Sequence, residues 1–375
     1  MKKLPIGIQS FEKIRSDTFY YVDKTPFVEM LAQSGGGYFF LSRPRRFGKS
    51  LFLDTLRQAF LGRRELFEGL HLEKRWDWSE SRPVFRLSFG SGVMRSLEEL
   101  RNSIESFLID LKNEFGVSYK KKNLSDRFLE AIRKAAESSG KRVVVLIDEY
   151  DKPILDNIER PELALELREE LKNLYSVLKD ADEFLKFVFI TGVTKFSKVS
   201  LFSGLNQLQD ITLHPEYATI CGYTQRELEA VFEDRLKGAD LHKIRCWYNG
   251  YSWLGEPLYN PFDVLLHLSE REFRPYWFET GTPSFLIRLM VEKQFFLPDL
   301  EGIEVSEKIL GSFDLDFIEP ENLLFQTGYL TIKDRYSIAD RIIYRLNIPN
   351  KEVRISFNDY FWFIRLKRTS LDELP

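Results

Sequence analysis

Residues 37–52, GYFFLSRPRRFGKSLF, constrain the fold of this chain more than any other segment. The apolar run at 38–41 predicts a short buried strand, and Gly48-Lys49-Ser50 opens an amphipathic helix. Strand, loop, Gly-Lys-Ser and helix is the order of a phosphate-binding loop. In such a loop, backbone N–H groups face the anion, the lysine reaches its outer phosphates and the serine ligates Mg²⁺. The segment therefore predicts a nucleotide site.

The loop departs from the full motif G-x-x-x-x-G-K-[ST], because Arg43 stands where the first glycine belongs. A Gly-Lys-Ser tripeptide also recurs by chance, so a basic, solvated turn that caps an ordinary helix is a second interpretation. In the nucleotide interpretation, the side chains of residues 43–46 approach the phosphates together with the backbone, which makes affinity sensitive to salt. The expected nucleotide-binding residues of the loop are Arg43, Pro44, Arg45, Arg46, Phe47, Gly48, Lys49 and Ser50.

Residues 142–151, RVVVLIDEYD, carry the second informative pattern. Five consecutive apolar residues, 143–147, predict a strand buried on both faces, as parallel sheets require. The strand ends in Asp148 and Glu149, the Walker B position of a P-loop enzyme, where Asp148 holds Mg²⁺ and Glu149 polarises the attacking water. A buried strand that ends at an ordinary acidic loop is the alternative. The two patterns together favour a nucleotide site, because weak motifs rarely meet in matching contexts by chance.

A third strand is predicted over residues 184–191, FLKFVFIT. Because it follows the Walker B strand and ends in polar residues, Thr191 and Thr194 are candidates for the group that senses the γ-phosphate, although both also fit a simple turn. Strands that alternate with helices predict an α/β domain of the P-loop NTPase class with a doubly wound, mostly parallel sheet. The residues expected to flank the base are Tyr21, Val22, Asp23 and Lys24.

Beyond residue 215 the pattern becomes helical and later changes again. A helical lid over the nucleotide is expected first, with an aromatic, strand-like link at residues 273–278. A small α+β region of winged-helix type follows, with a hairpin expected from 329–332 and 342–348. The expected division is 1–215 for the P-loop domain, 216–300 for the lid, 301–357 for the winged-helix-like region and 358–375 for a truncated tail.

Composition and charge narrow the class of protein further. The net charge is −3, so any nucleic-acid contact would need a local basic patch. The two cysteines, Cys221 and Cys246, lack metal-ligand spacing and are expected to be buried, reduced thiols. No window approaches the ~18 apolar residues of a membrane span, and no signal peptide is visible. We therefore expect a cytoplasmic protein without membrane contact.

These segments together resemble the AAA-ATPase-like family of bacterial and archaeal P-loop proteins. The resemblance rests on LPIGIQSFEKIR, YYVDKTPF, FLSRPRRFGKSLFL, VLIDEYDKP and ITGVTKFSKVSLFSGLNQLQDIT, and on later segments such as WYNGYSW and LLFQTGYLTI. It implies that Arg43 is a normal residue of the loop and that Asp148 and Glu149 act in the Walker B role. Members commonly continue into a PD-(D/E)XK nuclease domain. Only eighteen residues follow Phe357, without a D…(D/E)-x-K constellation on strands, so nuclease activity is not expected of this chain.

The leading hypothesis is an ATP-binding switch protein that hydrolyses ATP with Mg²⁺. Lys49 stabilises the β- and γ-phosphates, and Glu149 orients water. Ser50 and Asp148 hold the metal, and Thr191 contacts the nucleotide. The sequence leaves the oligomeric state open, including a homo-oligomer.

Two alternatives belong to other classes of protein. The first is a nucleotide-gated regulatory module with negligible turnover, which acts on a protein partner or an effector domain. The second is a DNA-binding protein that uses the C-terminal hairpin as a wing. The cations that support this second alternative are Arg335, Arg341 and Arg345. Binding of that kind is salt-dependent, because phosphate contacts release counterions.

Overall fold

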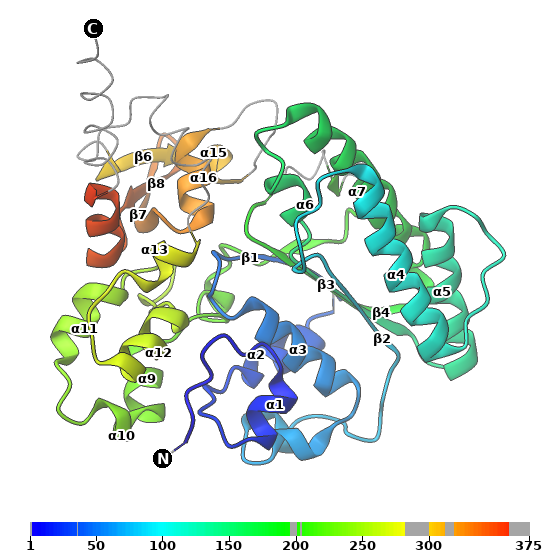
Figure 1. The fold of residues 1–375 in the computed structure, drawn as a ribbon, viewed down its shortest axis with the longest axis horizontal. Helices are drawn as coiled ribbons and strands as arrows, with labels where there is room; N and C mark the ends of the chain where they lie inside the picture. Colours follow the sequence, from blue (N-terminus) through cyan, green and yellow to red (C-terminus); the bar gives the residue numbers. More distant parts are fainter. Residues whose placement is uncertain are drawn as a thin grey trace, which may run out of the picture.

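The computed structural model describes residues 2–35, 37–195, 201–202, 205–281, 300–311 and 319–359. A central sheet lies between two groups of helices, and a helical segment and a smaller sheet lie beside it (Figure 1). In the described part of the chain, no helix is long and apolar enough to cross a membrane.

The central sheet positions the candidate site. Among the described residues it contains five parallel strands in the order β2-β3-β4-β1-β5. The strands are β1 (Tyr38–Ser42), β2 (Val84–Ser88), β3 (Val143–Asp148), β4 (Leu185–Gly192) and β5 (Gln209–Asp210). β4 therefore separates β1, which precedes the Gly-Lys-Ser loop, from β3, which carries the acidic pair. This arrangement confirms the predicted parallel sheet.

Helices cover both faces of this sheet. The helices of the first part of the chain are α1 (Phe11–Ser16), α2 (Thr25–Gln33), α3 (Lys49–Phe60), α4 (Leu97–Phe115), α5 (Leu124–Ser139), α6 (Lys152–Leu155) and α7 (Pro161–Asp180). Short 3₁₀ turns are η1 (Arg64–Phe67), η2 (His71–Lys74), η3 (Asp182–Phe184) and η4 (Pro215–Tyr217). Figure 1 shows α1, α2 and α3 on one side of the sheet and α4, α5 and α7 on the other.

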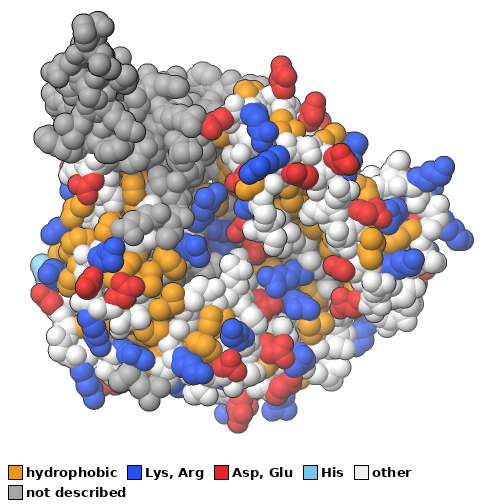
Figure 2. Space-filling view, in the orientation of Figure 1, with side chains coloured by type: hydrophobic (Ala, Val, Ile, Leu, Met, Phe, Trp, Pro, Cys, Tyr) orange, Lys and Arg blue, Asp and Glu red, His pale blue; other side chains and the backbone are white. Residues whose placement is uncertain are grey.

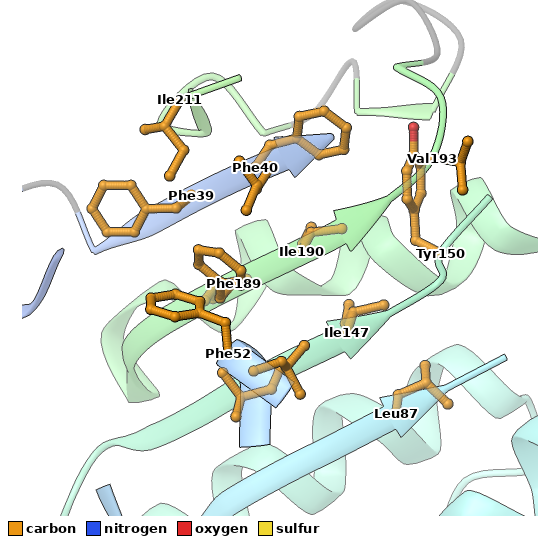
Figure 3. Close-up of a cluster of buried hydrophobic side chains, with 14 of the residues drawn as sticks. Phe39, Phe40, Phe52, Leu87, Ile147, Tyr150, Phe189, Ile190, Val193 and Ile211 are labelled. Carbon is orange, nitrogen blue, oxygen red and sulfur yellow. The ribbon is translucent and has the colours of Figure 1, made fainter. Parts of the chain in front are cut away.

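The side-chain alternation of the strands explains the two covered faces. Phe189 of β4 packs against Phe52 of α3, with ring centroids 5.7 Å apart (Figure 3). Phe40 of β1 points to the opposite face and contacts Tyr150 at 5.4 Å. Because successive side chains of a strand point to opposite faces, a strand buried on both faces must be apolar throughout. β3, with the sequence VVVLID, is buried at every position.

The helical segment after the sheet has an apolar cluster of its own. Its helices are α9 (Gln225–Val231), α10 (Glu233–Leu236), α11 (Leu241–Tyr248), α12 (Pro261–Glu270) and α13 (Tyr276–Gly281). The cluster also takes in Tyr20 and Val22 from the beginning of the chain. The expectation of a strand-like link at residues 273–278 is wrong, because α13 begins within it. Tyr276 and Trp277 are buried in two different apolar clusters, and the buried Glu352 carboxylate accepts a hydrogen bond from the Trp277 N–H in the first turn.

The smaller sheet is antiparallel, in the order β6-β8-β7 over the described residues. Its strands are β6 (Ile303–Ser306), β7 (Thr331–Ile338) and β8 (Arg341–Asn347), next to the helices α15 (Glu307–Gly311) and α16 (Pro320–Thr327) and a helix at 351–359. The β7–β8 pair confirms the predicted hairpin, whereas β6 was not predicted. Apolar residues of this region, including Leu324 and Leu346, belong to the same buried cluster as the central sheet.

Candidate nucleotide-binding site

The Gly-Lys-Ser loop has the predicted arrangement of strand, loop and helix. β1 ends at Ser42, and α3 begins at Lys49. Gly48 caps the helix with φ of 93°, and Arg46 has φ of 69°. Both values lie in the left-handed region, which glycine adopts freely and other residues adopt at a cost. α3 is 12 residues long and begins directly after the loop. The free N–H groups of its first turn and the positive end of its dipole therefore lie at the end of the loop.

Arg43, at the position of the missing glycine, anchors the loop to the backbone of residues after β5. Its side chain is fully buried. One guanidinium nitrogen donates to the carbonyl oxygens of Ser42 at 2.8 Å and Thr212 at 2.9 Å, and the other donates to that of Tyr217 at 3.2 Å. Burial lowers the pKa of Arg43 to about 10. Because these carbonyls occupy the guanidinium, its contacts do not support the expectation that this side chain approaches the phosphates.

Lys49 is held inside the loop. Its Nζ donates to the carbonyl oxygens of Arg43 and Pro44, both at 2.8 Å, and the side chain is almost fully buried. Burial lowers the pKa of Lys49, and the nearby carboxylates of Glu149 and Asp148 oppose this effect. The ammonium group thus contacts the loop backbone directly and interacts electrostatically with the acidic pair.

Asp148 and Thr191 place two polar atoms side by side at the ends of β3 and β4. The register pairs Ile147 with Ile190, so the next residue of each strand lies in the following row. Phe189 faces α3, and Thr191, two residues further on, faces the same side. Among the described residues, Asp148 Oδ1 and Thr191 Oγ1 are buried and have no hydrogen-bond partner. Burying such atoms costs free energy unless a ligand, a metal or a water molecule binds to them.

Glu149 has a strained backbone. Its φ of 50° is unusual for a glutamate, and such strain often marks functional sites. Gly90, just after β2, lies next to the Glu149 carboxylate, because a Cβ added there would be 3.4 Å from Glu149 Oε2. Burial raises the pKa of Glu149, and the Lys49 ammonium opposes the shift.

Asp151 organises the turn after β4. Its carboxylate accepts hydrogen bonds from the N–H groups of Val193 and Thr194 and from the Thr194 hydroxyl at 2.7 Å. A Cβ at Gly192 would lie only 2.4 Å from Asp151 Oδ1, so the close approach requires glycine. The Thr194 hydroxyl is therefore engaged in a structural contact. Of the two predicted threonines, Thr191 is the one with an unused hydroxyl in the described part of the chain.

A cavity of about 540 Å³ joins these elements. Both Lys49 and Glu149 line it, as do Arg45, Arg46 and Ser50. Asp148, Thr191, Arg43 and Pro44 are not among its lining residues. The described lining residues include five cations and two carboxylates: Lys24, Arg45, Arg46, Lys49, Lys152, Glu149 and Asp156. Cationic and anionic side chains are interspersed over the face in Figure 2, so the cationic lining is a local feature.

Apolar walls extend the cavity away from the loop. Of the four residues expected to flank the base, Tyr21, Val22 and Lys24 line the cavity and Asp23 does not. Phe262 of α12 lines it too. Cys221 also lines it and is buried, whereas Cys246 on α11 is exposed, so the expectation of two buried thiols is wrong for Cys246. α11 presents Trp247 and Tyr248 to its apolar cluster, and the adjacent Cys246 faces outward.

Sequence reasoning missed Lys152 and Asp156, which lie on the cavity wall after the acidic pair. Lys152 Nζ contacts Asp156 Oδ2 at 2.7 Å, and Arg45 lies 3.8 Å from Asp156 Oδ1. The i,i+4 spacing of a lysine and an aspartate, directly after the acidic end of β3, was the available signal.

A parallel α/β sheet, with a Gly-Lys-Ser loop after β1 and an acidic pair at the end of β3, defines a protein of P-loop-like class. The family described as predicted AAA-ATPase matches residues 5–202. The chain belongs to this AAA-ATPase-like family. It is also 53% identical over 359 residues to a protein of Azotobacter chroococcum mcd 1 described as an uncharacterized protein in the vnfD 5′ region. The aligned part covers 96% of this chain and 69% of that relative.

Proposed function

We propose that this protein binds ATP together with Mg²⁺ and hydrolyses the nucleotide. One observation carries the proposal: Lys49 and Glu149, from two different strand ends, line the same cationic cavity at the N-terminus of α3. A polyphosphate is the ligand that suits a helix N-terminus surrounded by cations. Membership of an AAA-ATPase-like family supports nucleotide binding.

The phosphate chain would lie along the loop. Lys49 would exchange its two carbonyl partners for oxygens of the β- and γ-phosphates, which carry a full negative charge where the carbonyls are neutral. Arg45 is half-buried and Arg46 is exposed, and both line the cavity. Their charges would then add to that of Lys49. Glu149 would accept a hydrogen bond from the attacking water and orient it toward the terminal phosphate.

Ser50 and Asp148 fit a magnesium site. Ser50 is the second residue of α3 and lines the cavity. The buried Asp148 Oδ1, without a hydrogen-bond partner among the described residues, is an available oxygen ligand. Within the described residues, no group of three or more His, Cys, Asp or Glu side chains is placed to hold a metal by itself. Mg²⁺ commonly takes most of its ligands from phosphates and water, and when bound it would neutralise phosphate charge.

The base would occupy the apolar end of the cavity. Tyr21 and Val22 form one wall, and Phe262 and Leu265 of α12 form another. We accordingly propose that helices α9 to α13 act as a lid whose first and fourth helices close on the base. The buried Lys24 ammonium joins the wall of Tyr21 and Val22 to the proposed lid, because it contacts the Glu227 carboxylate of α9 at 2.7 Å.

A regulatory module with negligible turnover is the second candidate, and contacts of the loop with the C-terminal half of the chain favour it. Trp277 Nε1 donates to the carbonyl oxygen of Arg45 at 3.2 Å. A Cβ added to Gly328 would lie 2.8 Å from Pro44, so α16 ends directly against the loop. Any movement of the loop on nucleotide binding would therefore reach α13 and α16.

The DNA-binding alternative has less support. The helix before the hairpin, α16, is buried along almost its whole length, so it presents no recognition surface. On the hairpin, Arg345 is paired with Glu304 at 3.0 Å. Arg335 and Arg341 lie close in sequence to Asp334 and Asp340, which reduces the local positive charge.

Measured phosphate release tests the proposal. The expected result is Mg²⁺-dependent release by the wild type, with Glu149→Gln retaining ATP binding and losing release. Tight ATP binding without phosphate release above background would favour the regulatory module over an ATP-hydrolysing enzyme. Release that survives both Lys49→Ala and Glu149→Gln would contradict the proposed site.

A further inference from the structure

The Asp156 carboxylate holds two cations of the cavity wall at once. Its Oδ2 contacts Lys152 Nζ at 2.7 Å, and its Oδ1 lies 3.8 Å from a guanidinium nitrogen of Arg45. Arg45 comes from the Gly-Lys-Ser loop, and Lys152 opens α6 after the acidic pair. One carboxylate therefore links the two segments that carry the proposed chemistry.

Lys152 is tied to the backbone of Glu149. Its N–H donates to the Glu149 carbonyl oxygen at 3.1 Å, so the two residues share one tight turn. Both side chains line the cavity that Lys49 also lines. Lys152 and the proposed water-orienting Glu149 therefore line the cavity from one turn of the backbone. The Lys152 side chain is 19% exposed, and its Nζ also donates to the carbonyl oxygen of Gly92.

The contact of Asp156 with Arg45 is the more easily exchanged of the two. Arg45 is the more exposed cation, and solvent weakens an ion pair that it can reach. The Asp156 side chain is 15% exposed, and that of Arg45 is 39% exposed. A terminal phosphate carries more negative charge than a carboxylate and offers three strong acceptor oxygens. It would therefore compete effectively for both cations.

We propose that Lys152 is a ligand of the terminal phosphate, and that Asp156 holds Lys152 and Arg45 in place when that phosphate is absent. This inference rests on the proposed function and adds residues that neither the loop motif nor the acidic pair contains. Lys152 supplies positive charge within the chain where negative charge accumulates during phosphoryl transfer. Asp156 acts as a positioning residue, since it touches the cations and not the nucleotide.

The two residues should have opposite effects on affinity. Lys152→Ala removes a cation that contacts the γ-phosphate, which ATP has and ADP lacks. Asp156→Asn removes a competitor of the phosphate while preserving the shape of the side chain. The first variant should lower the preference for ATP over ADP, and the second should raise it.

Binding of Mg-ATP and Mg-ADP, measured by calorimetry on the full chain, tests this inference. The expected result for Lys152→Ala is roughly tenfold weaker ATP binding with ADP binding changed less than twofold, since a hydrogen bond to a charged group has about this strength. The expected result for Asp156→Asn is ATP binding several-fold tighter than in the wild type. Lys172→Ala is the matched control, because Lys172 pairs with Glu169 on the surface of α7 and should change neither affinity.

The outcomes separate this inference from the proposed function. If the wild type binds neither nucleotide, the proposed function fails and the inference fails with it. If the wild type binds both and Lys152→Ala weakens ATP and ADP equally, or weakens neither, the inference is overturned and the proposed function stands. Weaker ATP binding by Asp156→Asn would also overturn it, even where Lys152→Ala is poorly folded.

Discussion

The guanidinium of Arg43 lies 4.3 Å from the ring of Trp253, so the residue that replaces the first glycine of the motif joins the loop to a distant aromatic turn. Phe47 packs against the same ring at 5.2 Å and against Tyr251 at 4.8 Å. Cation–π and ring contacts of this kind favour a fixed geometry. The bulky loop is thus held by packing where an ordinary P-loop relies on glycine.

Arg43→Gly should therefore destabilise the protein although it restores the motif. The variant would leave buried carbonyl groups without their donors, including those of Ser42 and Thr212. We expect a loss of about 2–4 kcal/mol in the free energy of unfolding, measured in urea. Arg75→Gly, at a side chain that is 60% exposed, is the control. An Arg43→Gly protein as stable as the wild type would refute this anchoring role.

Arg45 and Arg46 should make ATP affinity sensitive to salt. Both line the cavity, and the Arg46 guanidinium lies 4.7 Å from the ring of Phe262. We expect Arg45→Ala and Arg46→Ala each to weaken ATP binding roughly tenfold at low salt, with smaller differences at high salt, because screening reduces the contribution of exposed charges. Titrations at two ionic strengths measure this. Arg101→Ala, at an exposed pair with Glu170, serves as the control. Normal ATP binding by both variants would show that neither arginine side chain contributes to ATP affinity.

Turnover should fall on the acidic side through the titration of Glu149. Only the ionised carboxylate orients water, and burial raises the pKa of this group above its usual value. Phosphate release should therefore decline, as pH falls, at a higher pH than an exposed glutamate would give. The pH dependence of kcat/KM measures this limb. Glu149→Gln has no carboxylate to titrate at this position, so its affinity for ATP should not change over the same pH range. A rate that stays constant down to the usual pKa of glutamate would exclude the assignment.

Two buried carboxyl groups should make stability depend on pH. Asp263 and Glu352 are both fully buried, and burial together with the Glu352 charge raises the pKa of Asp263. The folded state then binds more protons than the unfolded state above the unfolded pKa of about 3.9. Stability should consequently fall as pH rises from there toward the folded pKa, by up to about 1.4 kcal/mol per pH unit for one proton.

Asp263→Asn isolates this effect. The amide keeps the shape of the protonated acid and removes the titration, so the variant should gain stability relative to the wild type as pH rises. Urea unfolding at pH 5 and pH 8 measures the difference between the two proteins. Asp340→Asn, in the exposed hairpin turn, is the matched control. Equal pH slopes for wild type and Asp263→Asn would show that this carboxyl does not titrate in the window.

Local patterns were sufficient to predict the central sheet and the loop. The apolar run before Asp148 favours a strand buried on both faces, and Gly48-Lys49-Ser50 before an amphipathic pattern favours the start of a helix. Both features depend on residues that are adjacent in the sequence, so a single sequence is enough to predict them.

Long-range packing decided what the sequence could not show. Nothing near Arg43 indicates that its partners are the carbonyls of Thr212 and Tyr217, which follow β5. The aromatic run at 273–278 has the composition of a strand, and its N–H contacts with the distant Glu352 carboxylate, which suit a helix N-terminus, cannot be seen in the local sequence. Lys152 escaped notice for the same reason, because its importance lies in sharing a cavity with Lys49.

The most direct test of the central claim is Mg²⁺-dependent ATP turnover and ATP binding, measured together for the wild type, Lys49→Ala and Glu149→Gln. The proposed site predicts that the wild type binds and hydrolyses ATP, that Lys49→Ala loses both activities, and that Glu149→Gln binds ATP and releases no phosphate above background. Turnover that persists in both variants at the wild-type rate would contradict it.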